Sequence, residues 1–230
     1  MRFKKQLIET LKLNIKLLNS GLQINSFGNA SIRYNGLCFI KPSGVDLKLI
    51  KFSDISVVDI KSGKILSGKK PSVDLNIHLS VYKNFKDINS ITHTHSLYAT
   101  SWAQSGRSIP CYGTTHADYY PKEIPITDSV TIKNLKNNYE VEIGNTIIKK
   151  LKKIKAKATD IPGVLIANHG VVAWGNTGKS AMENAIAIEF IAKLAFNSEL
   201  IKKNVKKLPN AIHKKHYNRK HGKNSYYGQK

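Results

Sequence analysis

Three histidines and one aspartate could together bind a metal ion. His93 and His95 lie two residues apart in the segment ITHTHS, and residues i and i+2 of a β-strand point to the same face. Two imidazoles on one face, joined by His169 and the carboxylate of Asp74, would offer three nitrogen ligands and one oxygen ligand. That set suits a divalent transition metal, most often zinc. The alternative is that one or two of these histidines are hydrogen-bonded residues of the core.

The elements that position these residues are predicted by the periodicity of the apolar side chains. Strands are expected over residues 30–34, 37–40, 55–59, 90–94, 163–167 and 171–174. Helices are expected over residues 2–19, 97–105 and 179–204, from Pro71 onwards, and along the apolar stripe of 143–154. His93 would then lie in a strand, Asp74 in the first turn of a helix, where the helix dipole favours a carboxylate, and His169 in a turn. The alternation of strands and helices predicts a layered α/β sandwich.

The composition indicates one globular domain over residues 1–230. No linker, repeat or low-complexity segment divides the 230 residues. No apolar run approaches about 20 residues, so no membrane partner is expected, and the N-terminus does not resemble a secretory signal. The isolated Cys38 and Cys111 favour a reducing, cytoplasmic location. The basic and aromatic tail, residues 208–230, is expected to be packed or used rather than frayed.

The formal net charge of +22 raises the alternative of a nucleic-acid-binding protein. Only four of the 37 basic residues are arginine, the side chain that most often reads guanine edges. The lysines are scattered, and those of residues 149–153 would lie on the solvated flank of a helix. We therefore interpret the charge as a solvated surface and expect no nucleic-acid partner. The alternative predicts binding that weakens steeply with salt.

Seven segments, in order from residue 27 to 229, resemble the class II aldolase family and, within it, its pentulose-phosphate 4-epimerases. They are FGNAS (27–31), KPSGVD (41–46), KPSVD (70–74), HTHS (93–96), GTTHADY (113–119), NHG (168–170) and HYNRKHG with YYGQ (216–229). The resemblance implies a three-layer α/β/α sandwich with a mixed, mostly antiparallel central sheet. It also implies a homotetramer with active sites at subunit interfaces, to which residues 208–230 contribute.

The reaction that the resemblance implies is the interconversion of L-ribulose 5-phosphate and D-xylulose 5-phosphate. Inverting the configuration of a carbon whose only substituents besides the carbon chain are H and OH requires oxidation at that carbon or cleavage of a bond to it. No Gly-x-Gly-x-x-Gly motif follows a strand, so the nicotinamide route lacks its binding fingerprint. Cleavage of C3–C4 leaves an enediolate, whose charge a zinc ion bound by Asp74, His93, His95 and His169 would stabilise as a Lewis acid.

Two proton carriers are needed, one on each side of C4. The resemblance assigns these roles to Asp118 and Tyr227, reaching the site from an adjacent subunit. Burial can raise the pKa of an aspartate, and a nearby cation can lower that of a tyrosine. Without the resemblance, Asp118 would be interpreted as a turn residue and Tyr227 as a packing aromatic.

The remaining site residues would bind the substrate and its phosphate, through hydroxyl and backbone N–H groups in tight turns and at a helix start. They are Gly28, Asn29, Lys41, Ser43, Gly44, Ser72, Val73, Thr114, Glu140 and His216. Val73 departs from the family pattern, which often has a second serine, and this removes a hydroxyl near the phosphate.

Two further alternatives lie within the same family. One is a sugar-phosphate aldolase, although those relatives generally place Glu where this chain has Asp74. The other is a non-catalytic, adducin-like member, which would be expected to lack the metal-binding histidines.

Overall fold

A single antiparallel sheet organises the part of the chain that the computed structural model describes, residues 3–133, 138–223 and 225–226. Its seven described strands lie in the order β4-β3-β2-β1-β5-β7-β6, and every neighbouring pair is antiparallel. They are β1 (Asn29–Tyr34), β2 (Leu37–Ile40), β3 (Ser56–Asp59), β4 (Ile65–Ser67), β5 (Ser90–Thr94), β6 (Gly163–Ile166) and β7 (Gly170–Gly175).

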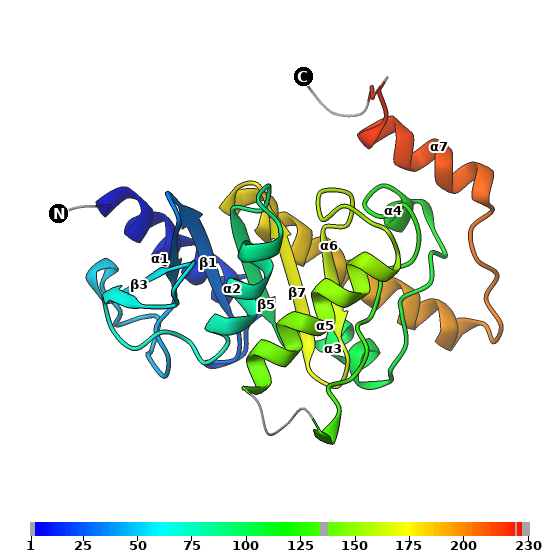
Figure 1. Ribbon diagram of the computed structural model, residues 1–230. Coiled ribbons are helices and arrows are strands. Elements are labelled where there is room, and N and C mark those ends of the chain that lie inside the picture. Colours follow the sequence, from blue (N-terminus) through cyan, green and yellow to red (C-terminus); the bar gives the residue numbers. More distant parts are fainter. Residues whose placement is uncertain (1–2, 134–137, 224, 227–230) are drawn as a thin grey trace.

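Helices cover both faces of this sheet, which gives the three layers that the family resemblance implies (Figure 1). They are α1 (Lys4–Asn19), η1 (Phe52–Asp54), α2 (Leu75–Asn84), α3 (Leu97–Gln104), α4 (Thr114–Ala117), α5 (Tyr139–Lys153), α6 (Gly178–Ile201) and α7 (Asn210–His221). Successive residues of β1 point to opposite faces of the sheet and so contact different outer layers. Ile32 approaches Leu13 of α1 and the start of α6, whereas the Ser31 hydroxyl lies 2.7 Å from His78 Nδ1 of α2. The fold prediction is confirmed.

The start of α2 differs from the sequence-based prediction. The helix begins at Leu75 and not at Pro71, because the residues before it are used in extended pairing. Pro71 forms a bridge with Pro42, and the Ser72 N–H donates to the Lys41 carbonyl oxygen at 3.0 Å. Asp74 is therefore the N-cap residue of α2, one position before the first turn. It still lies at the positive end of the helix dipole.

The C-terminal tail is largely helical. Its helix α7 packs against α4 and projects beyond the edge of the sandwich (Figure 1). His213 anchors it to the body, since its Nε2 lies 2.7 Å from the carbonyl oxygen of Tyr120. Elsewhere in the described ranges, Cys38 and Cys111 are buried free thiols, and no helix has both the length and the apolarity that a membrane span requires.

A buried amide joins α1 to the sheet. Asn14 Nδ2 donates to the carbonyl oxygens of Thr10 and Ala30, and Asn14 Oδ1 accepts the Ala30 N–H at 2.8 Å. Asn14 is fully buried, so water cannot replace these hydrogen bonds. The side chain fixes the start of β1, the strand whose first residue, Asn29, belongs to the candidate site.

We expect Asn14→Ala to destabilise the fold by about 1–3 kcal/mol, because it leaves the Ala30 N–H buried without an acceptor. This corresponds to a Tm about 2–12 °C lower for a chain of this size. Differential scanning calorimetry measures the change, with exposed Lys12→Ala on the same helix as the control. Equal Tm values for the two variants would contradict the assigned role.

Candidate active site

The three predicted histidines converge on one point at the end of β5. His93 Nε2 lies 3.1 Å from His95 Nε2 and 3.1 Å from His169 Nε2. Among the described residues, these three form a group whose potential ligand atoms all lie within 4.8 Å of one another. Their sequence separation of up to 76 residues is closed by the sheet, because β5 and β7 are adjacent.

The sheet also sets the orientation of His93. Its Nδ1 lies 3.0 Å from the carbonyl oxygen of Val171 in the neighbouring strand. A carbonyl oxygen only accepts, so Nδ1 carries the proton and Nε2 presents its lone pair to the other two histidines. A backbone hydrogen bond of this kind is the usual support for a metal-binding histidine.

Two glycines allow the neighbouring chain segments to approach β5 closely. A Cβ at Gly170, next to His169, would lie 2.6 Å from the Thr94 carbonyl oxygen, and one at Gly28 would lie 2.7 Å from that of His93. Gly28 also has φ of +109°, a backbone conformation that residues other than glycine rarely adopt. Any larger residue would push the turn that carries His169, or the segment before Asn29, away from the cluster.

Burial keeps the three imidazoles neutral. It lowers the pKa of His93 to about 3, and the neighbouring His169 and His95 act in the same direction. Burial likewise lowers the pKa of His95 and of His169. Neutral imidazoles are the form that binds metal ions.

Asp74 lies beside the histidine cluster. Its Oδ2 is 4.0 Å from His93 Nε2 and accepts a hydrogen bond of 2.7 Å from Asn29 Nδ2. Burial would raise the pKa of this carboxyl, but the nearby His93 and His78 and the Asn29 amide lower it overall. Asp74 is therefore a carboxylate facing three neutral nitrogens.

This donor set fits a divalent metal ion. Nitrogens bound at about 2.0–2.1 Å to a tetrahedral zinc ion are about 3.3–3.4 Å apart, close to the 3.1 Å that separates the His93 nitrogen from its two neighbours. Three neutral imidazoles and one carboxylate would hold zinc or a similar ion. A cation would also balance the buried negative charge of Asp74.

Several predicted substrate-binding residues surround Asp74. Asn29 Nδ2 also donates to the Ser72 hydroxyl at 3.0 Å, so both of its N–H groups are used. Asn29 Oδ1 is buried and has no hydrogen-bond partner in the described part of the chain. Lys41 is buried as well, with Nζ 3.5 Å from the Ser26 carbonyl oxygen. Burial lowers the pKa of this amine, although Asp74 opposes the shift.

The predicted phosphate-binding groups are only partly available. The N–H of Ser43 donates to Lys70 and that of Ser72 to Lys41, each to the carbonyl oxygen, so neither is free for an oxyanion, contrary to the expectation. The Ser72 hydroxyl is engaged as well, because it accepts from Asn29 Nδ2 at 3.0 Å and from the Asp74 N–H at 3.3 Å and donates to Asp74 Oδ2 at 3.5 Å. The Ser43 hydroxyl and the N–H groups of Gly44 and Val73 meet no partner within the described ranges. Val73 is 63% exposed.

A second group of predicted residues lies at the other end of the sheet. Asp118 and Trp174 line one cavity of 280 Å³, whereas His169 precedes Gly170 at the opposite end of β7. Six residues of a strand span about 20 Å. Asp118 therefore cannot reach the histidine cluster of its own chain.

Asp118 is held by α7. His216 Nδ1 lies 3.2 Å from its Oδ1, and the Arg219 guanidinium donates to both of its oxygens, at 3.0 and 2.6 Å. Burial would raise the pKa of Asp118, but the hydrogen bonds from Arg219 and His216 lower it overall. The direction is opposite to the rise that burial alone could produce.

The remaining predicted residues are Thr114, Glu140 and Tyr227. Thr114 begins α4 and is exposed, and its carbonyl oxygen accepts the Asp118 N–H. Glu140 lies in the first turn of α5, next to Tyr139, whose ring is 6.2 Å from that of His169. Tyr227 lies outside the described residues.

Arg219 is the residue that the sequence-based selection missed. The signal was its rarity, since only four arginines occur among 37 basic residues. A planar guanidinium is required where two parallel hydrogen bonds to a carboxylate are needed, and lysine cannot supply them.

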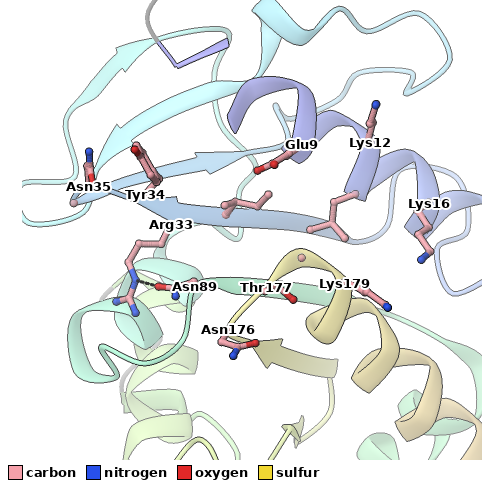
Figure 2. A pocket seen from close by; sticks show the side chains of 14 residues that line it. Glu9, Lys12, Lys16, Arg33, Tyr34, Asn35, Asn89, Asn176, Thr177 and Lys179 are labelled. Atoms are coloured by element: carbon pink, nitrogen blue, oxygen red, sulfur yellow. Dashed lines mark hydrogen bonds between the residues drawn. The ribbon is translucent and has the colours of Figure 1, made fainter. Parts of the chain in front are cut away.

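A larger cavity is not lined by the histidine cluster, but it shares the lining residue Asn176 with the cavity beside Asp118 (Figure 2). It has a volume of 830 Å³ and lies between the middle of α1 and the start of α6, at the Tyr34 end of β1. Lys12, Lys16 and Lys179 line it, but none of the predicted site residues does.

Fold and site together define a class of protein: a three-layer sandwich whose sheet carries a histidine cluster beside a carboxylate. The solved structures that it resembles include an L-fuculose 1-phosphate aldolase (27% identity, TM-score 0.80, covering 94% of this chain and 96% of that one). They also include YgbL from Klebsiella pneumoniae (23%, 0.74, 94% and 99%) and a sugar-phosphate aldolase from Thermotoga maritima (20%, 0.69, 91% and 100%).

The family is shown by the sequence as well. Residues 8–196 match the model of the class II aldolase and adducin N-terminal domain. The chain belongs to this family, and the family resemblance inferred from its motifs is confirmed.

We expect His95→Asn to lose its metal ion. Removing a supporting residue alone costs about 10–100-fold in metal affinity, so removing a ligand should cost at least about 100-fold. Elemental analysis after dialysis measures the metal content, with His221→Asn, which contacts the Asp118 carbonyl, as the matched control. Full metal content in His95→Asn would remove His95 from the ligand set.

Proposed function

We propose that this protein is a zinc-dependent epimerase that interconverts L-ribulose 5-phosphate and D-xylulose 5-phosphate by cleaving and re-forming the C3–C4 bond. The observation that carries the proposal is the convergence of three neutral imidazoles beside the carboxylate of Asp74. The shorter acid at position 74 favours a metal ligand, whereas the family's aldolases generally place there a glutamate that acts as a base.

His93, His95, His169 and Asp74 would hold the metal ion. When bound, the ion would supply Lewis-acid stabilisation of the negative charge that develops on the ketone half. The hydroxyls of Ser43 and Ser72 and the N–H groups of Gly44 and Val73 would bind the phosphate, together with the buried Lys41 amine. Gly28 and Asn29 would contact the substrate. Thr114, Glu140 and His216 would orient the substrate or the proton carriers.

Asp118 and Tyr227 would move the protons. One carrier removes the proton of the C4 hydroxyl, the C3–C4 electron pair passes to the ketone half, and glycolaldehyde phosphate forms. After the aldehyde rotates, its other face is attacked and the second carrier protonates the new alkoxide. The product differs from the substrate only in the configuration of C4.

We also propose a homo-oligomer, with a tetramer as the expected form. The support is the separation of Asp118 from the histidine cluster along β7. A site containing both groups requires two copies, one contributing the metal-binding end of the sheet and the other contributing Asp118 and α7. The expected location stays the cytoplasm.

A sugar-phosphate aldolase is the second candidate. It is favoured by the 27% identity to an L-fuculose 1-phosphate aldolase over 94% of this chain. Such an enzyme would release the two halves instead of recombining them.

We expect the purified protein with L-ribulose 5-phosphate and zinc to accumulate D-xylulose 5-phosphate, because the aldehyde would be retained and attacked again. Chromatography of the products with a coupled assay for each one measures the outcome. Free glycolaldehyde phosphate as the main product would establish the aldolase instead, and the zinc-free protein serves as the control.

We expect Tyr227→Phe to lower kcat by about 10²–10⁴-fold, the usual contribution of a general acid or base, while zinc stays bound. Steady-state kinetics and metal analysis of the same preparation test both parts. Tyr226→Phe is the matched control, and a normal kcat in Tyr227→Phe would show that Tyr227 carries no proton.

A further inference from the structure

The Asp118 carboxylate is held in place by two residues of α7. Arg219 Nε donates to its Oδ1 at 3.0 Å and Arg219 Nη2 to its Oδ2 at 2.6 Å, and His216 Nδ1 lies 3.2 Å from Oδ1. Two parallel hydrogen bonds between a guanidinium and a carboxylate fix both the charge and the direction of the carboxylate. The Asp118 side chain is only 12% exposed, so water screens this ion pair weakly.

Arg219 also contacts the segment that leads to the second predicted proton carrier. Its carbonyl oxygen accepts the N–H of Tyr226 at 3.0 Å. His221 of α7 also contacts Asp118, because its Nε2 lies 2.9 Å from the Asp118 backbone carbonyl oxygen. The last turn of α7 thus contacts both Asp118 and Tyr226, the residue before Tyr227.

We propose that Arg219 is a positioning residue that holds Asp118 as an ionised carboxylate, so that Asp118 enters the reaction as the proton acceptor. This inference rests on the proposed epimerase function and assigns a starting protonation state to each carrier. Because Asp118 starts without a proton, the carrier on the opposite face must start with one, as a neutral tyrosine hydroxyl does.

The proton balance follows from this assignment. Asp118 takes the proton of the C4 hydroxyl while the C3–C4 bond breaks, and its charge is neutralised beside Arg219. The opposite carrier gives its proton to the new C4 alkoxide when the bond re-forms. Each turnover therefore leaves both carriers in the other state, and exchange of one proton with water restores them.

Other charged groups lie near Asp118 and bear on any pH measurement. From α7 these are Arg219, His216, Lys220 and His221. Asp87 and Asp160 line the same cavity from other elements. The two acids carry the opposite charge to Arg219, whose guanidinium contacts both oxygens of the Asp118 carboxylate.

The test compares Arg219→Gln with Arg219→Lys by the pH dependence of kcat/KM. Loss of an adjacent cation raises the pKa of an aspartate by about 1–3 units, so the acidic limb of the profile should move up by that amount in Arg219→Gln. Arg219→Lys keeps the charge but loses the paired hydrogen bonds. Its acidic limb should stay near that of the wild type, while kcat falls about 10–100-fold because the carboxylate is misplaced.

The matched control is Arg107→Gln. Arg107 also donates two hydrogen bonds to a carboxylate, that of Glu199, at 3.0 and 2.8 Å, and this pair includes none of the groups that contact Asp118. It should leave the pH profile and kcat within about twofold of the wild type. A general cost of losing a paired contact to a carboxylate would appear in both variants, although it would be smaller for the more exposed Arg107–Glu199 pair.

A double-mutant cycle decides whether Arg219 acts through Asp118. Adding Arg219→Gln to Asp118→Asn should lower kcat no further than Asp118→Asn alone. The proposal would be overturned if the losses of kcat in the two single variants multiplied in the double variant. It would also be overturned if the acidic limb of the kcat/KM profile of Arg219→Gln stayed at its wild-type position.

The same cycle measured by Tm separates this inference from the proposed function. Coupled Tm losses without any epimerase activity would show that the ion pair exists but the proposed function is wrong. Epimerase activity with independent effects of the two substitutions would keep the function and reject the positioning role.

Discussion

The hydrogen bond between His93 and the backbone of β7 is the contact on which the site depends. It joins β5, which carries His93 and ends one residue before His95, to β7, which begins one residue after His169. Because β5 lies between β1 and β7, Asn29 and its partner Asp74 reach the same end of the sheet from the other side. Complete burial of His93 keeps its imidazole neutral. The rigid core of the sheet thus supplies the geometry that a metal ion would need.

The candidate chemistry is divided between two ends of the molecule. One end carries neutral nitrogens, a carboxylate and a buried lysine, which suit a cation and a phosphorylated substrate. The other carries Asp118, bound by α7, which projects beyond the sandwich (Figure 1). Among the described residues, the histidine cluster and the carboxylate of Asp118 lie at different ends of β7. This separation is the physical reason for expecting assembly, because a second copy can bring the two ends together.

Lysine dominates the basic residues, and this makes the arginines informative. In the described ranges Arg33 donates to three backbone carbonyl oxygens, of Tyr82, Phe85 and Lys86. Arg107 and Arg219 each bind a carboxylate through two nitrogens. Lysine offers one point charge and cannot match these geometries. The net charge of +22 therefore says little about partners, whereas the few guanidinium groups mark structural demands.

The sequence alone determined the fold class, most strands and the family, because apolar periodicity and the ordered motifs are local properties of the chain. It also indicated His93 and His95 as neighbours, since alternate strand residues share a face. It misplaced the start of α2, because Pro71 and Ser72 are held in extended pairing by Pro42 and Lys41, residues far away in sequence. Only the tertiary structure decided that His169 joins the other histidines and that Arg219 binds Asp118. Both facts depend on contacts between segments about 75 to 100 residues apart, which no local pattern encodes.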